Sequence, residues 1–171
     1  MTRRKQNKGL VLAVHPTARG FGWVLFEAPL SPVDWGMVFA TPGRNERLLN
    51  RFERLLQRYE PSVLVLEAFE SGVACRADRI QRLCRSLIHL AACRGMDTPV
   101  YSKAVVRTCF ASVGAVTRYE IAEVIRQQID AFKHKPLRKR RTWDNLDSRQ
   151  SLFDAAALAM TYFGLLSDTQ P

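Results

Sequence analysis

Short apolar runs alternate with turn residues over the first forty positions of the chain. Residues 10–14 and 21–26 form two such runs, and the segment Pro-Thr-Ala-Arg-Gly at 16–20 separates them. A third run at 35–40 precedes Thr-Pro-Gly at 41–43, a combination that breaks regular structure. Runs of this length with tight connections predict three consecutive strands in an antiparallel meander.

After residue 45 the apolar spacing becomes helical. Positions 48, 49, 52, 55 and 56 recur at steps of three and four, which predicts a helix that Pro61 ends. Arginines occupy positions 47, 51, 54 and 58, elsewhere on the circumference of that helix. Residues 63–66 are continuously apolar, which is typical of a parallel strand buried on both faces.

The remaining pattern predicts helices and one short strand. We expect helices over 77–93, 102–111, 117–132 and 147–166, and a strand at 99–101. Thr117 and Glu120 have the spacing of a capping box. This order of elements predicts an α/β fold with a mixed sheet covered by helices. We expect a single domain over 1–171, with a basic tail at 1–8 and a basic loop at 133–146.

Composition and cysteine usage narrow the class of protein. Hydrophobic residues make up 47% of the 171 positions and charged residues 25%, which is ordinary for a soluble globular domain. No apolar run reaches the roughly 18 residues of a membrane span, and the first run is too short for a signal peptide. The cysteines at 75, 84, 93 and 109 lack a zinc-binding spacing. We therefore expect a cytoplasmic protein with no membrane partner, whose cysteines are reduced apolar fillers.

The net charge of +10 is concentrated in two short segments. Four of the 26 cations lie within residues 3–8 and six within 133–141, and neither segment contains an acid. The 16 other cations balance the 16 acidic residues. Clustered positive charge predicts a polyanionic partner, first of all nucleic acid. A solvated, solubilising role and an anionic membrane surface are the alternatives.

Three polar residues stand where the apolar pattern alone does not explain them. His15 ends the first predicted strand, Glu67 ends the fourth, and Asp154 interrupts an apolar helix. Ligands gather at the carboxyl ends of strands in open α/β sheets, and Asp147, Ser151 and Asp154 share one helix face. Convergent carboxylates in a basic protein predict a divalent-metal site that acts on a phosphodiester. Alternatively, Glu67 is a capping carboxylate and Asp154 a surface one.

Three segments carry a resemblance to a known family: VLAVHPTARGFGWVLFE at 11–27, VLVLEAFE at 63–70 and SLFDAAALAM at 151–160. In order and spacing they resemble the signature segments of the RuvC-like Holliday junction resolvases, within the RNase H-like superfamily. The resemblance also includes 102–129 and so covers nearly the whole chain. It implies an RNase H-like mixed five-stranded sheet, a homodimer, and two divalent metal ions, magnesium or manganese. The implied activity is metal-dependent endonuclease cleavage of branched DNA.

The resemblance also implies roles for individual residues. Glu67 and Asp154 match two of the family's metal-binding acids, and Ser151 stands where relatives often carry Asp or His. Lys103 matches a basic residue that lies near the scissile phosphate. Arg19 falls in the loop after the first segment.

His15 departs from the family pattern, which has an aspartate that bridges both metal ions. Imidazole offers one nitrogen and no compensating charge, and magnesium prefers oxygen ligands. We expect His15 to be a metal ligand or a base toward the attacking water, with a structural role as the alternative. Three outcomes follow for the site. The site works with manganese or with one metal ion, it is rebuilt around Asp147 or Glu70, or it has lost cleavage and kept DNA binding.

A second set of residues is predicted to contact nucleic acid. Trp143 follows the basic run and either stacks on an unpaired base or anchors the loop on the core. Contacts of this kind predict recognition of shape, not of sequence. The predicted contact residues are Arg19, Lys103, Arg107, Arg118, Arg138, Lys139, Arg140, Arg141 and Trp143. The function hypotheses are a resolvase-like endonuclease, a binding module without cleavage, and an RNase H-like nuclease for RNA or hybrids.

Overall fold

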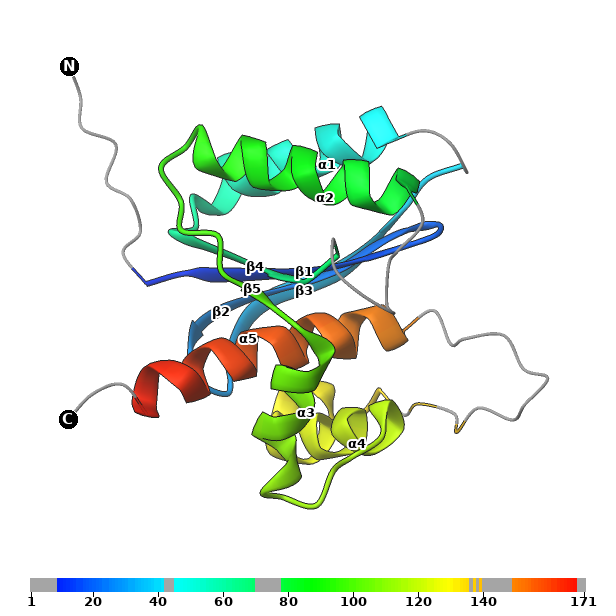
Figure 1. Ribbon diagram of the computed structural model, residues 1–171, viewed down its shortest axis with the longest axis vertical. Helices are drawn as coiled ribbons and strands as arrows, with labels where there is room; N and C mark the ends of the chain where they lie inside the picture. Colours follow the sequence, from blue (N-terminus) through cyan, green and yellow to red (C-terminus); the bar gives the residue numbers. More distant parts are fainter. Residues whose placement is uncertain are drawn as a thin grey trace.

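A five-stranded sheet forms the centre of the molecule (Figure 1). The computed structural model describes residues 9–41, 45–69, 78–135, 137, 139 and 149–168. The strands are β1 (Val11–Thr17), β2 (Gly20–Ala28), β3 (Ser31–Phe39), β4 (Val63–Glu67) and β5 (Val100–Tyr101). Their order in the sheet is β3-β2-β1-β4-β5. The β1–β2 and β2–β3 pairs are antiparallel, and the β1–β4 and β4–β5 pairs are parallel. The predicted meander and mixed sheet are confirmed.

Helices cover both faces of this sheet (Figure 1). On one face lie α1 (Asn45–Tyr59) and α2 (Asp78–Ala92), and on the other lies α5 (Gln150–Asp168). The pair α3 (Lys103–Ala111) and α4 (Arg118–Gln128) packs against α5. Within the described residues the predicted helices are therefore present.

One predicted helix is shorter than expected. The helix expected over 117–132 ends at Gln128, and a 3-10 turn, η2 (Asp130–Phe132), follows it. Ile129 between them is extended, with φ −108° and ψ 108°. Ile129 and Phe132 are both buried, so the chain keeps its apolar contact with the core across the break.

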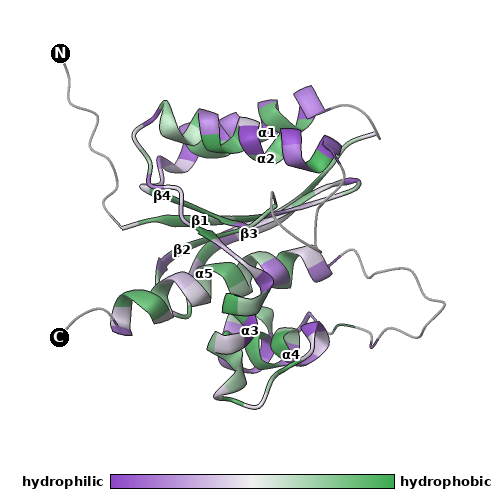
Figure 2. Ribbon diagram, viewed as in Figure 1, coloured by the Kyte–Doolittle hydropathy of each residue, from purple (hydrophilic) through white to green (hydrophobic). Residues whose placement is uncertain are grey.

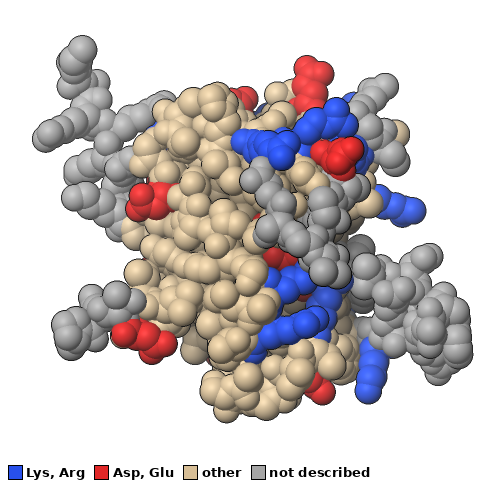
Figure 3. Space-filling view, viewed as in Figure 1, with Lys and Arg blue, Asp and Glu red and all other residues tan. Residues whose placement is uncertain are grey.

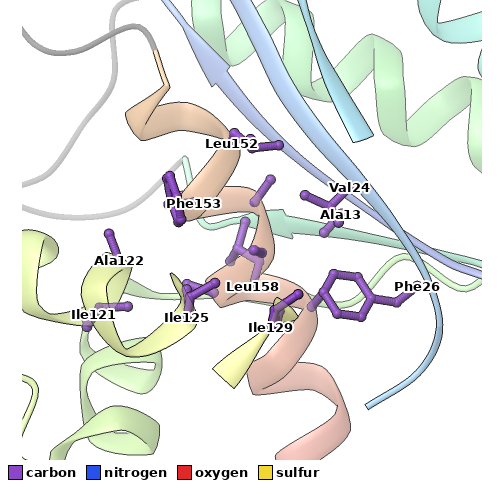
Figure 4. Close-up of a cluster of buried hydrophobic side chains, with 14 of the residues drawn as sticks. Ala13, Val24, Phe26, Ile121, Ala122, Ile125, Ile129, Leu152, Phe153 and Leu158 are labelled. Atoms are coloured by element: carbon purple, nitrogen blue, oxygen red, sulfur yellow. The ribbon is translucent and has the colours of Figure 1, made fainter. Parts of the chain in front are cut away.

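Each strand residue contributes to one of two cores because side chains alternate across the sheet. Leu12 and Val14 of β1 face the layer of α1 and α2, whereas Val11 and Ala13 face α5. Figure 2 shows β1 and β4 as mostly hydrophobic ribbons, and Figure 4 shows α5 between the strands and α4. Burial on both faces explains why β4 reads as an unbroken apolar run.

Three of the four cysteines lie in the described part of the chain. Cys84 is buried, as expected of a filler, and Cys109 is partly buried. Cys93 is exposed, so the filler interpretation is wrong for it: it follows α2 in a turn, with its Sγ 3.7 Å from His89 Nε2. Cys75 lies outside the described residues. None of the described helices combines the length and the apolar character that crossing a membrane requires.

Candidate nucleic-acid site

The parallel pairing of β1 and β4 brings two of the predicted site residues together. Val14 pairs with Leu66, so the next residues, His15 and Glu67, emerge side by side at the same edge of the sheet. The expectation that His15 ends the first strand is wrong, because β1 continues to Thr17 through its pairing with β2. His15 Nε2 lies 3.5 Å from Glu67 Oε2, and both side chains are nearly buried. We call this edge, where β1 and β4 end, the rim.

α5 brings the third residue to the rim. Asp154 Oδ2 lies 3.6 Å from His15 Nδ1. This approach depends on Gly22, which pairs with His15 in the sheet. A Cβ atom at Gly22 would lie 2.4 Å from the carbonyl carbon of Ser151, so only glycine lets the start of α5 come this close. The structure thus unites His15, Glu67 and Asp154, as the sequence predicted.

Two cations accompany the two carboxylates. Lys103 Nζ lies 3.9 Å from Glu67 Oε1. Arg118 Nε donates to both oxygens of Asp154, at 2.9 and 3.0 Å, and its NH2 group also pairs with Asp154. Gln150 Nε2 donates to Asp154 Oδ1 at 3.1 Å. Each rim carboxylate therefore already has a cation beside it.

The pKa of Arg118 reflects this pairing. Burial of the guanidinium opposes its charged form, but the hydrogen bond and negative charge of Asp154 outweigh burial and raise the pKa of Arg118. Arg118 is consequently a permanent cation at the rim.

Helix capping places both cations, because Lys103 and Arg118 are the first residues of α3 and α4. Ser102 Oγ accepts from the Val105 N–H at 3.2 Å and caps α3. The predicted capping box at α4 is confirmed: Thr117 Oγ1 accepts from the Glu120 N–H at 3.2 Å, and Glu120 accepts from the Thr117 N–H at 2.8 Å. Well-defined helix starts hold the two cations over the carboxylates.

A pocket of about 400 Å³ opens over these groups. His15, Glu67 and Asp154 line it together with the cations Lys103, Arg107 and Arg118. Apolar side chains complete the wall: Ile80, Val106, Ile121 and Leu158. In the view of Figure 3, Lys and Arg side chains lie on both halves of the molecule, over the α1 and α2 layer and over α3 and α4.

The described rim residues do not fit a pair of magnesium ions. Magnesium requires about six oxygen ligands in octahedral geometry. Here two carboxylates flank an imidazole, and Lys103 and Arg118 already balance their charge. Among the residues the structure describes, no three His, Cys, Asp or Glu side chains are arranged to hold a metal ion. Ser151 is buried. The predicted ligand roles of these residues stay predictions, and Asp147 and Glu70 lie outside the described part.

The other predicted contact residues are only partly described. Arg19 is exposed in the turn between β1 and β2, apart from the pocket lining. Leu137 is buried in the core, and Lys139 is exposed and close enough to Glu120 to affect its pKa. Lys139 therefore lies near the start of α4. The remaining predicted contacts lie outside the described residues: Arg138, Arg140, Arg141, Trp143 and the basic tail at 1–8.

Sequence reasoning missed two features of the rim. Gln150, four residues before Asp154 on the same helix face, was not singled out. Arg118 was expected to contact phosphate, and its pairing with Asp154 was not foreseen, because the two residues are 36 positions apart. The helical spacing of Gln150 and Asp154 was a usable signal, whereas nothing in the sequence pairs α4 with α5.

Comparisons with known proteins agree with this architecture. No family model matches the chain, and no curated protein matches it in sequence. Among solved structures, Thermus thermophilus RuvC superposes with a TM-score of 0.69 at 17% identity, covering 94% of this chain and 97% of that one. The chain has the RuvC-like fold.

Two further structures extend the comparison. The yeast mitochondrial Holliday junction resolvase Ydc2 has a TM-score of 0.60 at 14% identity, over 92% of this chain and 78% of that one. The fowlpox virus resolvase, in a complex with Holliday junction DNA, has a TM-score of 0.54 at 11% identity, over 92% of this chain and 98% of that one. The RuvC-like fold confirms the five-stranded mixed sheet that the sequence resemblance implied.

Proposed function

We propose that this chain binds branched DNA at the rim pocket, with Lys103 and Arg118 contacting the phosphates. Two properties support the proposal. The RuvC-like fold is that of resolvases, and two of the similar structures are complexes with a Holliday junction. The pocket also joins a basic surface, formed by α3 and the start of α4, to the strand ends at which α/β proteins bind ligands.

One observation carries this proposal: the side chains of both rim cations are exposed, whereas those of the carboxylates are nearly buried. The side chains of Lys103 and Arg118 are 57% and 44% exposed, whereas those of Glu67 and Asp154 are 11% and 13% exposed. A phosphate arriving from solvent thus meets the cations first. Arg118 offers a planar fork that matches phosphate oxygens, and Lys103 offers a compact charge. Such contacts position DNA without reading its sequence.

Metal-dependent cleavage of the bound DNA, with magnesium or manganese, is the second candidate function. The observation that favours it is that Glu67 and Asp154, two of the acids implied by the resemblance, face one pocket. In this version the chain is a homodimeric endonuclease. The imidazole of His15 and the hydroxyl of Ser151, at two positions where relatives carry ligands, favour binding alone.

A binding and cleavage assay on one set of substrates separates these functions. We expect wild-type protein to bind a four-way DNA junction at least about tenfold (about 1.4 kcal/mol) more tightly than a duplex of equal length. We expect it to leave the junction intact with either metal. Cleavage of the junction by wild-type protein would establish the endonuclease. Equal affinity for junction and duplex would contradict the proposed function, and a preference for an RNA–DNA hybrid would favour the third hypothesis.

Acidic substitutions at the rim test whether His15 and Ser151 are the reason that the described rim residues do not form a metal site. The double substitution His15→Asp with Ser151→Asp adds two carboxylates beside Glu67 and Asp154. Because oxygen ligands and negative charge both favour hard divalent cations, we expect manganese binding measured by calorimetry to rise at least about tenfold. Ser31→Asp, on the far end of β3, is the control for the added charge. Manganese binding by wild-type protein equal to that of the double variant would show that the rim is already a metal site.

A further inference from the structure

A row of four arginines lies on α1, in the helical layer across the sheet from α5 (Figure 1). All four residues are exposed. Steps of four, three and four place them within about 60° of the helix circumference and over about 16 Å of its length. We call Arg47, Arg51, Arg54 and Arg58 the α1 arginine row.

No described carboxylate compensates the row. Within the described residues none of the four arginines forms an ion pair. The Arg58 guanidinium lies 4.9 Å from the centre of the Tyr59 ring. The acids of the same helix, Glu46 and Glu53, lie on another side of α1, where they line the groove against α2. Like charges at these spacings destabilise a helix, so the row does not serve the fold.

The row has the chemistry of a phosphate-binding surface. Arginine forks bind phosphate oxygens in pairs, and about 16 Å of duplex DNA carries roughly nine phosphate charges. The apolar residues Leu48, Phe52 and Leu56 of α1 are buried in the core. Leu49 and Leu55 pack against the same core and are partly buried. The exposed residues of α1 are all polar or charged, so this side offers no exposed apolar residue to enter a membrane or to form the centre of a protein interface.

One end of the row lies at the rim. The Asn45 side chain, at the start of α1, donates to the Arg79 carbonyl at 3.2 Å. The Arg79 guanidinium in turn donates to the Ala18 carbonyl, in the turn that follows β1. Arg47 therefore lies near the edge where β1 and β4 end, and Arg58 lies toward the opposite edge.

We propose that the α1 arginine row binds the phosphate backbone of a duplex DNA segment adjacent to the rim pocket. In branched DNA this segment is an arm that leaves the pocket and runs along α1. The inference extends the proposed function, because it adds a second contact surface to the same substrate. The row and the rim cations are separate surfaces, so each can be removed without the other.

Salt dependence of binding tests the row directly. The probes are a four-way DNA junction, a linear DNA duplex and phosphatidylserine vesicles, each titrated with full-length protein at several salt concentrations. With all four arginines changed to Gln, we expect the slope of log affinity against log salt for the junction to decrease in magnitude by about 3 to 4. The control variant carries Lys at all four positions, and we expect it to keep the slope.

Each result bears on one of the two proposals. An unchanged slope in the Gln variant would overturn the row as a DNA surface, and so would a loss confined to the vesicles. If the proposed function is right, the double variant Lys103→Gln, Arg118→Gln loses its preference for the junction over the duplex. It keeps the part of the salt slope that the α1 arginine row contributes. Suppose that wild-type protein shows no junction preference, but the variant with Gln at all four row positions has a smaller salt slope on the duplex. The proposed function is then wrong, and the proposal that the row binds DNA is supported.

Discussion

The rim and the α1 arginine row place positive charge in opposite ways. At the rim, Lys103 and Arg118 each face a nearly buried carboxylate, and three polar residues from β1, β4 and α5 converge within 4 Å. On α1 the arginines face solvent with no described acid opposite. The rim is a packed, charge-compensated site that requires exact backbone positions, whereas the row requires only a helix. Substitutions in the rim should therefore affect stability and binding together, and substitutions in the row binding alone.

The largest expected effect is on the packing that builds the rim. Gly22→Ala places a methyl group 2.4 Å from the Ser151 backbone, and α5 must move to relieve the clash. We expect a loss of about 1–3 kcal/mol in the free energy of unfolding, measured by chemical denaturation. Gly164→Ala, within α5 itself, is the control, because a Cβ atom there meets nothing within 4 Å. That control should be neutral or stabilise by up to about 1 kcal/mol. Equal stability of the two variants would contradict the close approach of α5.

The sequence predicted the sheet well because its signals are local. The meander follows from short apolar runs with tight turns, and the parallel strand at 63–66 follows from its unbroken apolar character. The capping box of Thr117 and Glu120 depends on two residues three positions apart. Signals of this kind need no knowledge of tertiary structure.

The candidate site was predictable only in part because its contacts cross between elements. The strand order and the polar residues at strand ends were enough to predict that His15 lies close to Glu67 and Asp154. Pairing of Arg118 with Asp154 depends on how α4 packs against α5, and no local pattern encodes that packing.

A charge substitution at the rim gives the next largest effect and sharpens the contrast with the row. Asp154→Asn removes the carboxylate that engages Nε and NH2 of Arg118, so more of the donors of this guanidinium become available to phosphate than in the wild type. Without divalent metal, we expect tighter junction binding, with a salt slope steeper by about 0.9. Asp130→Asn is the control, because it removes an exposed carboxylate that pairs with Lys133 in the 3-10 turn. If Asp154→Asn binds the junction more weakly than wild type in the presence of manganese, and equally well in the presence of a chelator, the metal-dependent function is favoured instead.

The smallest expected effect is a pH dependence at the start of α4, which holds Arg118 at the rim. Hydrogen bonds from the backbone N–H groups of Thr117 and Val116 lower the pKa of Glu120 below its ordinary value of 4.5. A lowered pKa in the folded state means that Glu120 contributes stability above pH 4.5 and loses that contribution as the pH falls through the lowered value. Unfolding free energies of wild type and Glu120→Gln, compared from pH 6 to pH 3, should therefore converge toward the acid end. No described acid pairs with the α1 arginine row, so DNA binding by the row should not change as Glu120 becomes protonated. A loss of DNA binding by the row over the same pH range would contradict the separation of the two surfaces.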